Sequence, residues 1–486
     1  MSTATIAWIA LPFFIGFSSY LLPKLDRHLA LGVALTSLGY GLWAIFAPSP
    51  LSLHLLDHFG VTLMVDATSG YFILTNALVT AAVILYCWPG SKTAFFFTQA
   101  IILHGSVNAV FVCADFISLY VALEVIGIAV FLLIAYPRTD RSIWVGLRYL
   151  FVSNTVMLFY LIGAVLVYQA NHSFAFNGLR GAPTEAIALI FLGLLTKGGI
   201  FVSGLWLPLT HAEAETPVSA LLSGVVIKAG VFPLVRCALL VEEVGPILQI
   251  FSVATVLLGV SYAILERDTK RMLASSTISQ LGFVLAAPAA AGFYALTHGL
   301  AKAALFLMAG NLPSRKFSDL RQTPVPLTVW LALAIASLSI CGFPLLAGYE
   351  AKVLTLKQLG SWQSTILSVA AVGTAIAFAK FIFLPCKGQR LSWTPNPGDR
   401  PYFNANLWGG IILLLGGLVA ANGLYTEGYT LVNLGKSLAT IAIGWLSYFL
   451  VFQKLVVQLP RALEQFEHLI GVMSLMLILL FGMVLA

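Results

Sequence analysis

Long apolar runs recur along nearly the whole chain, and no other feature restricts its fold as much. The runs are about 20 residues long, which is the length an α-helix needs to cross the hydrocarbon core of a membrane. Charged residues make up 9% of the chain, whereas soluble domains average about 25%. The sequence therefore predicts an all-α polytopic membrane protein without a soluble domain of ordinary size.

We expect about 14–16 transmembrane helices from these runs, with errors of about 2–4 residues at their ends. The expected spans are residues 4–22, 29–47, 67–88, 93–113, 115–136, 143–168, 184–207, 217–240, 246–264, 273–290, 293–310, 325–347, 364–385, 404–424, 432–452 and 468–486. The first run is followed by the basic residues Lys24 and Arg27. A signal peptide carries its charge before the apolar segment, so we expect a first span and not a cleaved leader.

Basic side chains in the loops indicate how the chain is oriented. Lysine and arginine follow the first, third, fifth, ninth, eleventh, thirteenth and fifteenth spans, as Arg267, Lys270 and Arg271 do after the ninth. The opposite loops hold acids such as Glu242 and Glu243. Positively charged loops stay on the inner side of a membrane, which puts the N-terminus outside. The net charge of +7 thus reflects topology, and we expect no nucleic-acid partner.

The sequence contains no motif for a redox cofactor or a metal. Its five cysteines include no C-x-x-C pair and lie mostly in or beside apolar runs, which favours buried structural thiols. There is no G-x-G-x-x-G on a βαβ unit, no C-x-x-C-H and no iron–sulfur spacing. We therefore expect no cofactor, no metal and no redox site in this chain.

Two lysines lie inside apolar runs in the stretch 191–236. A lysine in hydrocarbon costs roughly 2.5–3.5 kcal/mol on insertion scales, so Lys197 and Lys228 indicate a functional site. The alternative is that their ammonium groups reach the interface, but both lie well inside their spans. Glycine and proline interrupt the same stretch, where a membrane helix can break and free backbone groups. Lysine suits proton transfer because burial removes its charge readily, whereas arginine stays charged.

This stretch resembles the proton-translocating, antiporter-like subunits of respiratory complex I and of Mrp-type Na+/H+ antiporters. The matching residues are Lys197, Trp206, Leu207, Pro208, Thr216, Pro217, Val218, Ser219, Ala220, Leu221 and Lys228. Glu215 departs from the pattern, because the family usually has proline there. Residues 268–280 are similar to a second family motif, and the resemblance extends over about residues 60–385.

The resemblance implies two inverted five-helix repeats, formed by spans 4–8 and 9–13, in which the seventh and twelfth helices are broken. The sequence agrees, because Lys197 lies in a glycine-rich seventh span and Lys352 follows a second segment interrupted by glycine and proline. The expected units are N-terminal helices in residues 1–92, repeats in 93–240 and 246–385, and C-terminal helices in 404–486.

Further ionisable residues lie inside the predicted spans. The resemblance implies that Glu124 in the fifth span pairs with Lys197, the alternative being a protonated glutamate hydrogen-bonded in the core. His298 and Lys302 lie four residues apart and therefore on one helix face. The family has a similar pair in its eleventh helix, which favours a proton relay over an isolated core histidine.

Lys352 matches a position in the twelfth helix where the family has lysine or, in one complex I subunit type, glutamate. If the helix ended earlier, Lys352 would be a loop residue instead. Three other polar residues are expected to be structural: His104 as a hydrogen-bonding core residue, Lys380 as a lysine reaching the interface, and Asp66 as a helix cap. Glu350 receives no role.

These residues favour a proton-conducting subunit of a larger membrane complex. The expected proton-transfer residues are Glu124, Lys197, Lys228, His298, Lys302 and Lys352. The resemblance implies other membrane subunits as partners and a bacterial inner membrane, with a thylakoid membrane as the alternative. It implies H+ as the transported ion and leaves Na+ open.

Within this class, Lys352 favours a Mrp-type D-like subunit over a proton-pumping subunit of an NAD(P)H-quinone oxidoreductase. A stand-alone secondary transporter also fits broken helices, but the sequence shows no solute pocket. A redox enzyme in its own right lacks the cofactor motifs.

Overall fold

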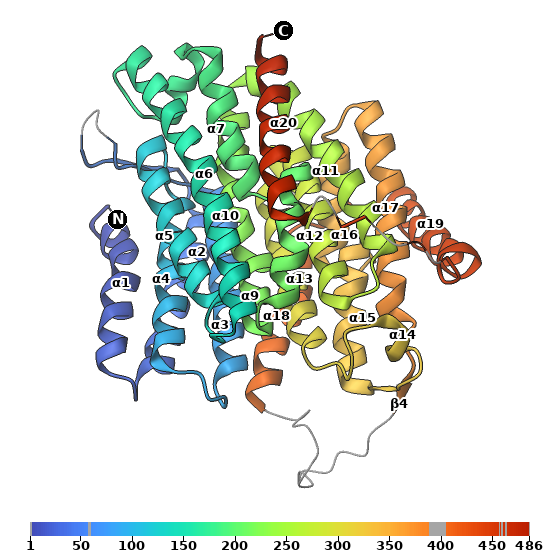
Figure 1. The fold of residues 1–486 in the computed structure, drawn as a ribbon. Helices are drawn as coiled ribbons and strands as arrows, with labels where there is room; N and C mark the ends of the chain where they lie inside the picture. Colours follow the sequence, from blue (N-terminus) through green and yellow to red (C-terminus); the bar gives the residue numbers. More distant parts are fainter. Residues whose placement is uncertain are drawn as a thin grey trace.

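The computed structural model describes residues 2–56, 60–387, 405–455, 457, 460–461 and 464–485, without the side chains of residues 405 and 406. Long helices run up and down side by side and form one thick bundle (Figure 1). Among the described residues, twelve helical segments are long and apolar enough to cross a membrane, and three shorter apolar helices accompany them. The predicted all-α polytopic fold is confirmed.

The elements follow the order of the predicted spans. They are α1 (Ser2–Leu21), α2 (Asp26–Phe46), β1 (Leu51–His54), β2 (Thr62–Val65), α3 (Ala67–Cys87), α4 (Ala94–Val110), α5 (Phe116–Ile134), α6 (Asp140–Asn171), α7 (Thr184–Lys197), α8 (Trp206–Glu213), α9 (Thr216–Leu221), α10 (Ile227–Leu240), α11 (Gly245–Leu265), α12 (Thr269–Ala286), α13 (Ala291–Ala309), α14 (Phe317–Leu320), β3 (Val325–Pro326), α15 (Leu327–Cys341), α16 (Ala347–Lys357), α17 (Ser361–Ile382), β4 (Cys386–Lys387), α18 (Ala405–Asn422), α19 (Leu431–Ser447) and α20 (Phe466–Leu485). Each predicted span overlaps with a helix. Residues 1, 404 and 486, which begin or end predicted segments, lie outside the described residues.

Acidic side chains fix where several helices begin. Asp66 caps α3 by accepting a hydrogen bond from the Ser69 amide at 2.9 Å, and Asp268 caps α12 by accepting from the Arg271 amide at 3.0 Å. A cap satisfies a backbone N–H that has no partner inside the helix, and its charge complements the positive helix end. Asp66 therefore caps its helix as the sequence predicted.

Asp66 also forms an ion pair that joins the start of α3 to α10. Arg236 Nη2 lies 2.6 Å from Asp66 Oδ1, and Nη1 contacts Oδ2. Burial alone would raise the pKa of Asp66, but the hydrogen bonds and charge of Arg236 lower it below its usual value. The pair therefore stabilises the fold above about pH 4, and this contribution is lost as the pH falls through the lower pKa of the folded state.

Replacing Asp66 with asparagine is expected to lower the free energy of unfolding by about 2 kcal/mol at pH 7, because Arg236 loses a charged hydrogen-bond partner. Thermal unfolding of the purified protein in detergent measures this loss, and the difference from wild type should shrink below about pH 4. Glu243→Gln removes an exposed acid and serves as the control. Wild-type stability of the Asp66 variant at pH 7 would contradict the prediction.

The first helix break lies in the predicted seventh span. α7 ends at Lys197, and a short 3₁₀ segment, Phe201–Leu205, leads into α8. Gly199 between them has a φ of 64°, which glycine adopts without strain. Trp206 Nε1 donates to the Thr196 carbonyl at 3.1 Å and so satisfies a group that the break would leave free.

The second break separates α15 from α16 in the predicted twelfth span. α15 ends at Cys341, and Gly342 follows with a φ of 84°, the left-handed conformation that commonly ends helices. Ser437 of α19 donates to the Gly342 carbonyl at 2.5 Å. Both breaks thus expose backbone groups inside the bundle, where side chains satisfy them.

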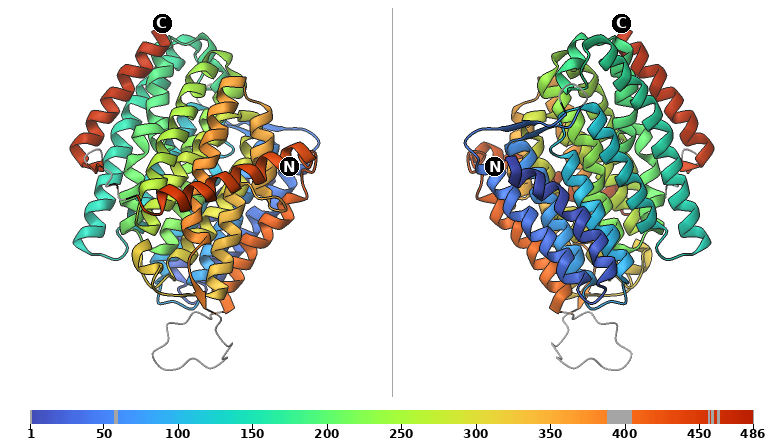
Figure 2. Two further views of the ribbon diagram at one scale, coloured as in Figure 1. Left: turned by 90° about the vertical axis from the view of Figure 1, so that its right-hand side faces the viewer. Right: turned by 90° about the vertical axis from the view of Figure 1, so that its left-hand side faces the viewer.

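Helix α19 lies across the outer face of α17 instead of running beside it (Figure 2). Gly444 allows the close crossing, since an added Cβ would lie 2.9 Å from the Val372 carbonyl. The predicted span 432–452 is therefore helical but oblique. Apolar composition sets the length of such a helix, whereas its neighbours set its tilt. The last helix, α20, packs along α6 and α7.

Four of the five cysteines are buried, as the sequence predicted, but Cys386 is exposed. It lies in β4, which pairs in parallel with β3 at the lower end of the bundle in Figure 1. The expectation of a buried thiol was wrong for this residue because α17 ends at Ile382, before the apolar run reaches Cys386.

Candidate functional site

Glu124 and Lys197 form an ion pair inside the bundle. Lys197 Nζ lies 3.9 Å from Glu124 Oε1 and donates to the Leu123 carbonyl at 3.0 Å. Lys197 is 8% exposed, so its ammonium group does not reach the interface. The end of α7 thus brings the lysine against α5, and the two residues predicted to pair lie together.

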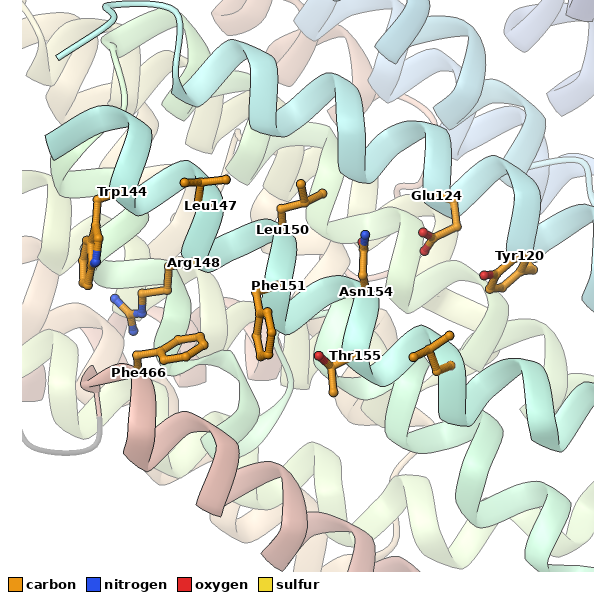
Figure 3. A pocket seen from close by; sticks show the side chains of 11 residues that line it. Tyr120, Glu124, Trp144, Leu147, Arg148, Leu150, Phe151, Asn154, Thr155 and Phe466 are labelled. Atoms are coloured by element: carbon orange, nitrogen blue, oxygen red, sulfur yellow. The ribbon is translucent and has the colours of Figure 1, made fainter. Parts of the chain in front are cut away.

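Glu124 also borders a cavity of about 790 Å³ between α5, α6 and the start of α20 (Figure 3). Its walls are mainly apolar side chains of α6. Glu124, Tyr120 and Asn154 gather at one end of the cavity, and Arg148 lies at the other. The Glu124 side chain, which is 24% exposed, is therefore accessible from this cavity.

A much smaller cavity of about 10 Å³ touches Lys197 itself, together with Ser153 and Thr196. This volume is close to that of one water molecule. The hydroxyls of Ser153 and Thr196 have no hydrogen-bond partner among the described residues. A single water here would find several polar groups around it.

Lys228 is fully buried in α10 and donates to two backbone carbonyls, those of Ser223 at 3.2 Å and Gly224 at 2.6 Å. Residues Leu222–Val226 form a π-helical turn, whose wider hydrogen-bond pattern makes carbonyls available to the lysine. Such bulges occur frequently at functional sites. Gly299 of α13 lies directly against the ammonium group and leaves room for it.

Replacing Gly299 with alanine is expected to displace Lys228 and slow transport by about tenfold or more. The added Cβ would collide with Thr75 and lie 2.9 Å from the Gly224 carbonyl and 3.4 Å from Lys228 Nζ. Overpacking of this kind costs about 1–3 kcal/mol. Vesicle transport, normalised to subunit abundance, measures the effect.

The matched control for this variant is Gly409→Ala in α18, where nothing lies within 4 Å of an added Cβ. It should transport like wild type. Equal transport by the Gly299 and Gly409 variants would show that the packing against Lys228 is unimportant.

His298 and Lys302 lie one turn apart on α13, and both are buried. Lys302 Nζ donates to the Leu273 carbonyl of α12 at 2.9 Å. Neither ring nitrogen of His298 has a hydrogen-bond partner among the described residues. His298 lines a second cavity of about 10 Å³, which reaches Ser339 and Gly348 at the break between α15 and α16.

Lys352 lies in helix α16 and is 8% exposed, so the loop alternative does not hold. Its Nζ donates to the carbonyl of Cys341 at 3.2 Å. Cys341 is the last residue of α15 before the break. The ammonium group also lies over the ring of Phe283, 5.7 Å from the ring centre. The second break therefore holds a lysine, as the first one does.

The predicted residues fall into three neighbouring groups. Glu124 contacts Lys197 directly. Lys228 lies against α13 at Gly299, the residue between His298 and Lys302 that comes directly after His298. Lys352 lies on α16, whose Gly348 lines the small cavity beside His298. The structure thus spreads the ionisable groups through the bundle from α5 to α16.

Sequence reasoning missed His211, a fully buried residue at the end of α8. Neither of its ring nitrogens has a hydrogen-bond partner within the described parts of the chain. Tyr294 was also missed; its hydroxyl donates to Gln280 Oε1 at 2.7 Å beside the His298 cavity. The available signal for His211 was its place in the polar break HAEAETP between two apolar runs.

His104 fits its predicted structural role. Its Nδ1 lies 3.1 Å from Thr80 Oγ1, and its Nε2 lies 2.8 Å from Ser37 Oγ. Trp8 and Asn108 both donate to Ser37 Oγ, which occupies the lone pairs of that oxygen. The Ser37 hydroxyl must then donate to His104 Nε2, so the histidine is neutral and fully satisfied.

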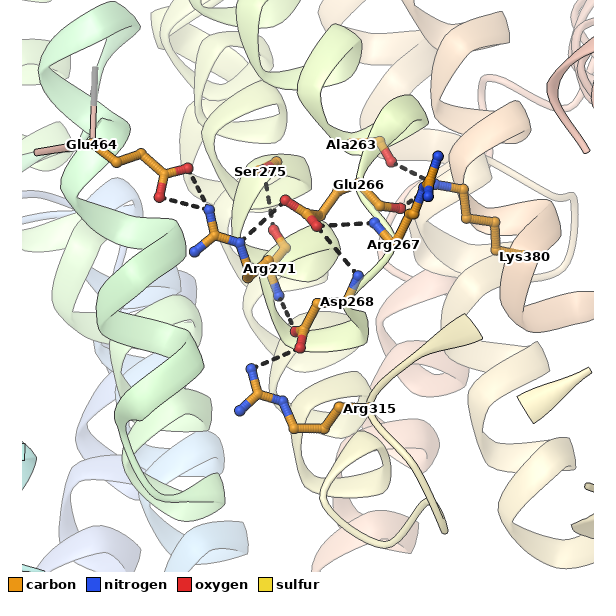
Figure 4. Close-up of polar contacts among 9 residues, drawn as sticks. All are labelled: Ala263, Glu266, Arg267, Asp268, Arg271, Ser275, Arg315, Lys380 and Glu464. Atoms are coloured by element: carbon orange, nitrogen blue, oxygen red, sulfur yellow. Dashed lines mark hydrogen bonds and ion pairs between the residues drawn. The ribbon is translucent and has the colours of Figure 1, made fainter. Parts of the chain in front are cut away.

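Lys380 and Glu350 have structural surroundings that the sequence did not specify. Lys380 lines a pocket at the end of α11, and its Nζ donates to the carbonyls of Ala263 at 3.0 Å and Glu266 at 2.7 Å (Figure 4). The Lys380 ammonium group thus satisfies free backbone carbonyls at the C-terminal end of α11. Glu350, which had no predicted role, is fully buried on α16 beside Gly428.

A cluster of charges joins α12 to the start of α20 (Figure 4). Arg271 Nε lies 3.2 Å from Glu266 Oε2, and its Nη2 lies 2.6 Å from Glu464 Oε2. Arg315 Nη2 lies 2.8 Å from Asp268 Oδ2. Arg315 directly precedes α14, which lies with β4 toward the lower end of the bundle in Figure 1; we call this the basic end.

Comparison with known proteins agrees with this arrangement. A family model described as "NADH:quinone oxidoreductase/Mrp antiporter, TM" matches residues 113–377. NADH-quinone oxidoreductase subunit N of Desulforudis audaxviator is 30% identical over 76% of this chain and 83% of the relative. NAD(P)H-quinone oxidoreductase chain 4 1 of Synechococcus elongatus is 29% identical over 62% of this chain and 64% of the relative.

Two solved structures share the fold. A chain of the membrane-bound sulfane sulfur reductase, an archaeal respiratory membrane complex, aligns with a TM-score of 0.76 and 20% identity over 92% of this chain and 99% of that one. A chain of the Mrp complex from Dietzia sp. aligns with a TM-score of 0.77 and 22% identity over 97% of this chain and 59% of that one. From the family match and the subunit N relative, the chain belongs to the NADH:quinone oxidoreductase/Mrp antiporter family of transmembrane proteins.

Proposed function

We propose that this chain is a proton-translocating membrane subunit of a multi-subunit complex. The observation that carries the proposal is the series of ionisable residues running from α5 to α16, all of which are buried except the half-buried Glu124. Its members are Glu124, Lys197, Lys228, His298, Lys302 and Lys352. Inserting these groups into a membrane costs on the order of 15 kcal/mol of free energy in total. A passive scaffold would gain nothing from this cost, so the groups indicate a function.

The hydrogen bonds of the lysines suit proton transfer. Each ammonium donates to a backbone carbonyl, as Lys228 does to Gly224 and Lys352 does to Cys341. A carbonyl can accept from a lysine in both its charged and its neutral form, so the side chain stays in place when the proton leaves. A carboxylate partner, as Glu124 is for Lys197, favours the charged form instead. Separation of that pair would release a proton.

The two helix breaks support a division into two units, residues 93–240 and 246–385. In each unit a broken helix carries a lysine, Lys197 in the first and Lys352 in the second. Lys228, His298 and Lys302 lie between them, at the boundary of the two units. Protons would pass from one unit to the other through this central group, with water bridging the gaps.

Within this function we favour a Mrp-type D-like cation/proton antiporter subunit, as Lys352 suggests. The second candidate is a proton-pumping subunit of an NAD(P)H-quinone oxidoreductase, which the names of the relatives favour. In both cases other membrane subunits supply the driving reaction. The protein would act as a multi-pass protein of a bacterial inner membrane or a thylakoid membrane.

Reconstitution of the intact complex distinguishes these functions. If a Na+ gradient produces a pH gradient across the vesicle membrane, the result supports the antiporter. If the oxidation of NAD(P)H by a quinone produces the pH gradient, the result supports the oxidoreductase. The chain should migrate with partner subunits on a native gel. If it migrates alone and transports a solute without partners, it is a stand-alone transporter and the proposal is wrong.

A further inference from the structure

His211 occupies an unusual position for a buried histidine. It is 0% exposed, lies in the last turn of α8, and has no hydrogen-bond partner for either ring nitrogen among the described residues. A buried polar group without a partner costs about 1–3 kcal/mol, so its presence needs an explanation. His104 is equally buried but has partners on both nitrogens, which shows how a purely structural histidine is accommodated in the same bundle.

The ring of His211 lies next to the central lysines. It stacks on Phe306 of α13, with 4.5 Å between ring centres and 17° between planes. Phe306 is one helical turn from Lys302, so the two side chains lie on the same side of α13. Lys270 and Lys302 are the basic groups near the ring. α12, which carries Lys270 and the Leu273 carbonyl that binds Lys302, packs against α8.

A large polar pocket opens close to His211 at the basic end. It has a volume of about 1010 Å³, and the two residues after His211, Ala212 and Glu213, belong to its lining. Charged side chains dominate the remaining wall, among them Asp268, Arg271 and Arg315. Figure 4 shows these three side chains around the start of α12. Water in this pocket would therefore contact Ala212, the residue that follows the buried histidine in the sequence.

Side chains hold the backbone that connects this pocket to His211. Arg315 Nη1 donates to the Ala212 carbonyl at 2.8 Å, and Lys270 Nζ donates to the Ala214 carbonyl at 2.8 Å. Ser219 Oγ donates to the carbonyl of His211 itself at 3.3 Å. The turn after α8 is thus fixed on both sides, whereas the imidazole ring is left with free nitrogens.

We propose that His211 is a proton-transfer residue that connects the polar pocket at the basic end with Lys302. The proposal rests on the proposed function and adds a branch to it, because none of the sequence-predicted proton-transfer residues lines this pocket.

The step is a simple relay. A hydronium ion in the pocket gives a proton to the free nitrogen of neutral His211, and the opposite ring nitrogen gives its own proton to the neutral amine of Lys302, directly or through one water. The lysine becomes an ammonium group, the histidine returns to the neutral form, and one water molecule remains in the pocket. No other reactant is needed, and the reverse sequence releases a proton at the basic end.

The test uses His211→Gln and His211→Phe in the assembled complex, reconstituted in vesicles of known orientation. Glutamine keeps hydrogen-bonding capacity and phenylalanine keeps the stack on Phe306, but neither relays protons. Both variants should assemble normally and lose at least about tenfold of their transport rate. The remaining rate should no longer respond to the pH on the basic-end side, while it still responds to the pH on the other side.

His104→Gln is the matched control, since it changes an equally buried histidine that has all its hydrogen bonds. Its transport per assembled complex should equal that of wild type. If His211→Gln assembles and keeps more than half of the wild-type rate with an unchanged pH response, the inference is wrong. Lys197→Met in the same assay separates the two ideas. If Lys197→Met loses transport and His211→Gln does not, the proposed function stands and only the role of His211 is wrong. If Lys197→Met transports normally, the proposed function is wrong as well.

Discussion

Lys197→Met is expected to reduce proton transport by at least about 100-fold while the complex still assembles. Methionine fills a similar volume and removes the cost of burying an ammonium group, roughly 3 kcal/mol, so stability should not suffer. Glu124 loses its lysine partner at 3.9 Å, and the pair that would open and close during transport no longer exists. The measurements are the pH gradient formed by vesicles and the abundance of the complex on a native gel.

Two controls show whether the proton or only the charge of Lys197 matters. Lys197→Arg keeps the charge beside Glu124, but an arginine does not release its proton, so this variant should be as inactive as the methionine variant. Lys24→Met changes an exposed lysine and should have no effect. Full transport by the arginine variant would assign Lys197 a structural charge and remove it from the proton path.

Lys352→Leu is expected to give a stable complex without transport, and Lys352→Glu a complex with roughly a tenth of the wild-type rate. Lys352 donates to the Cys341 carbonyl at the second break. Leucine neither holds that carbonyl nor takes up a proton. A glutamate can take up a proton in its charged form, and the protonated carboxyl group can then donate a hydrogen bond to the carbonyl. Its charged form is negative, however, so the sign of its electrostatic interaction with Lys302 should be reversed.

Vesicle transport and subunit abundance are again measured together for these two variants. Lys380→Leu is a suitable comparison, because that lysine is similarly buried but lies at the end of α11, away from both breaks. It should lower stability more than transport. Normal pumping by Lys352→Leu would show that the second break is not part of the proton path.

Much of the site follows from sequence because charges in apolar runs are rare. Lys197, Lys228, Lys302 and Lys352 stand out for this reason alone, and spacing places His298 one turn before Lys302. The breaks are also foreseeable, because glycine and proline interrupt the spans that carry Lys197 and Lys352. The structure adds that each of these lysines donates to a backbone carbonyl.

Other features depend on tertiary packing and leave little trace in sequence. The π-helical turn that supplies the Gly224 carbonyl has an ordinary apolar sequence. His211 lies in a segment that reads as a polar loop, and only packing between α8, α12 and α13 buries it. The oblique course of α19 depends on the close contact at Gly444, and a hydrophobic run of the same length is compatible with any tilt.

Because Cys386 is exposed, its thiol can be labelled with a thiol-specific reagent in the wild-type protein. The other four thiols are buried, so a membrane-impermeant maleimide should react with this residue alone. Because β4 lies at the same end of the bundle as α14, labelling from one side of a sealed vesicle reports which way that end faces (Figure 1). The orientation inferred from basic loops, with the N-terminus outside, requires modification only by reagent on the inner side, without any engineered residue.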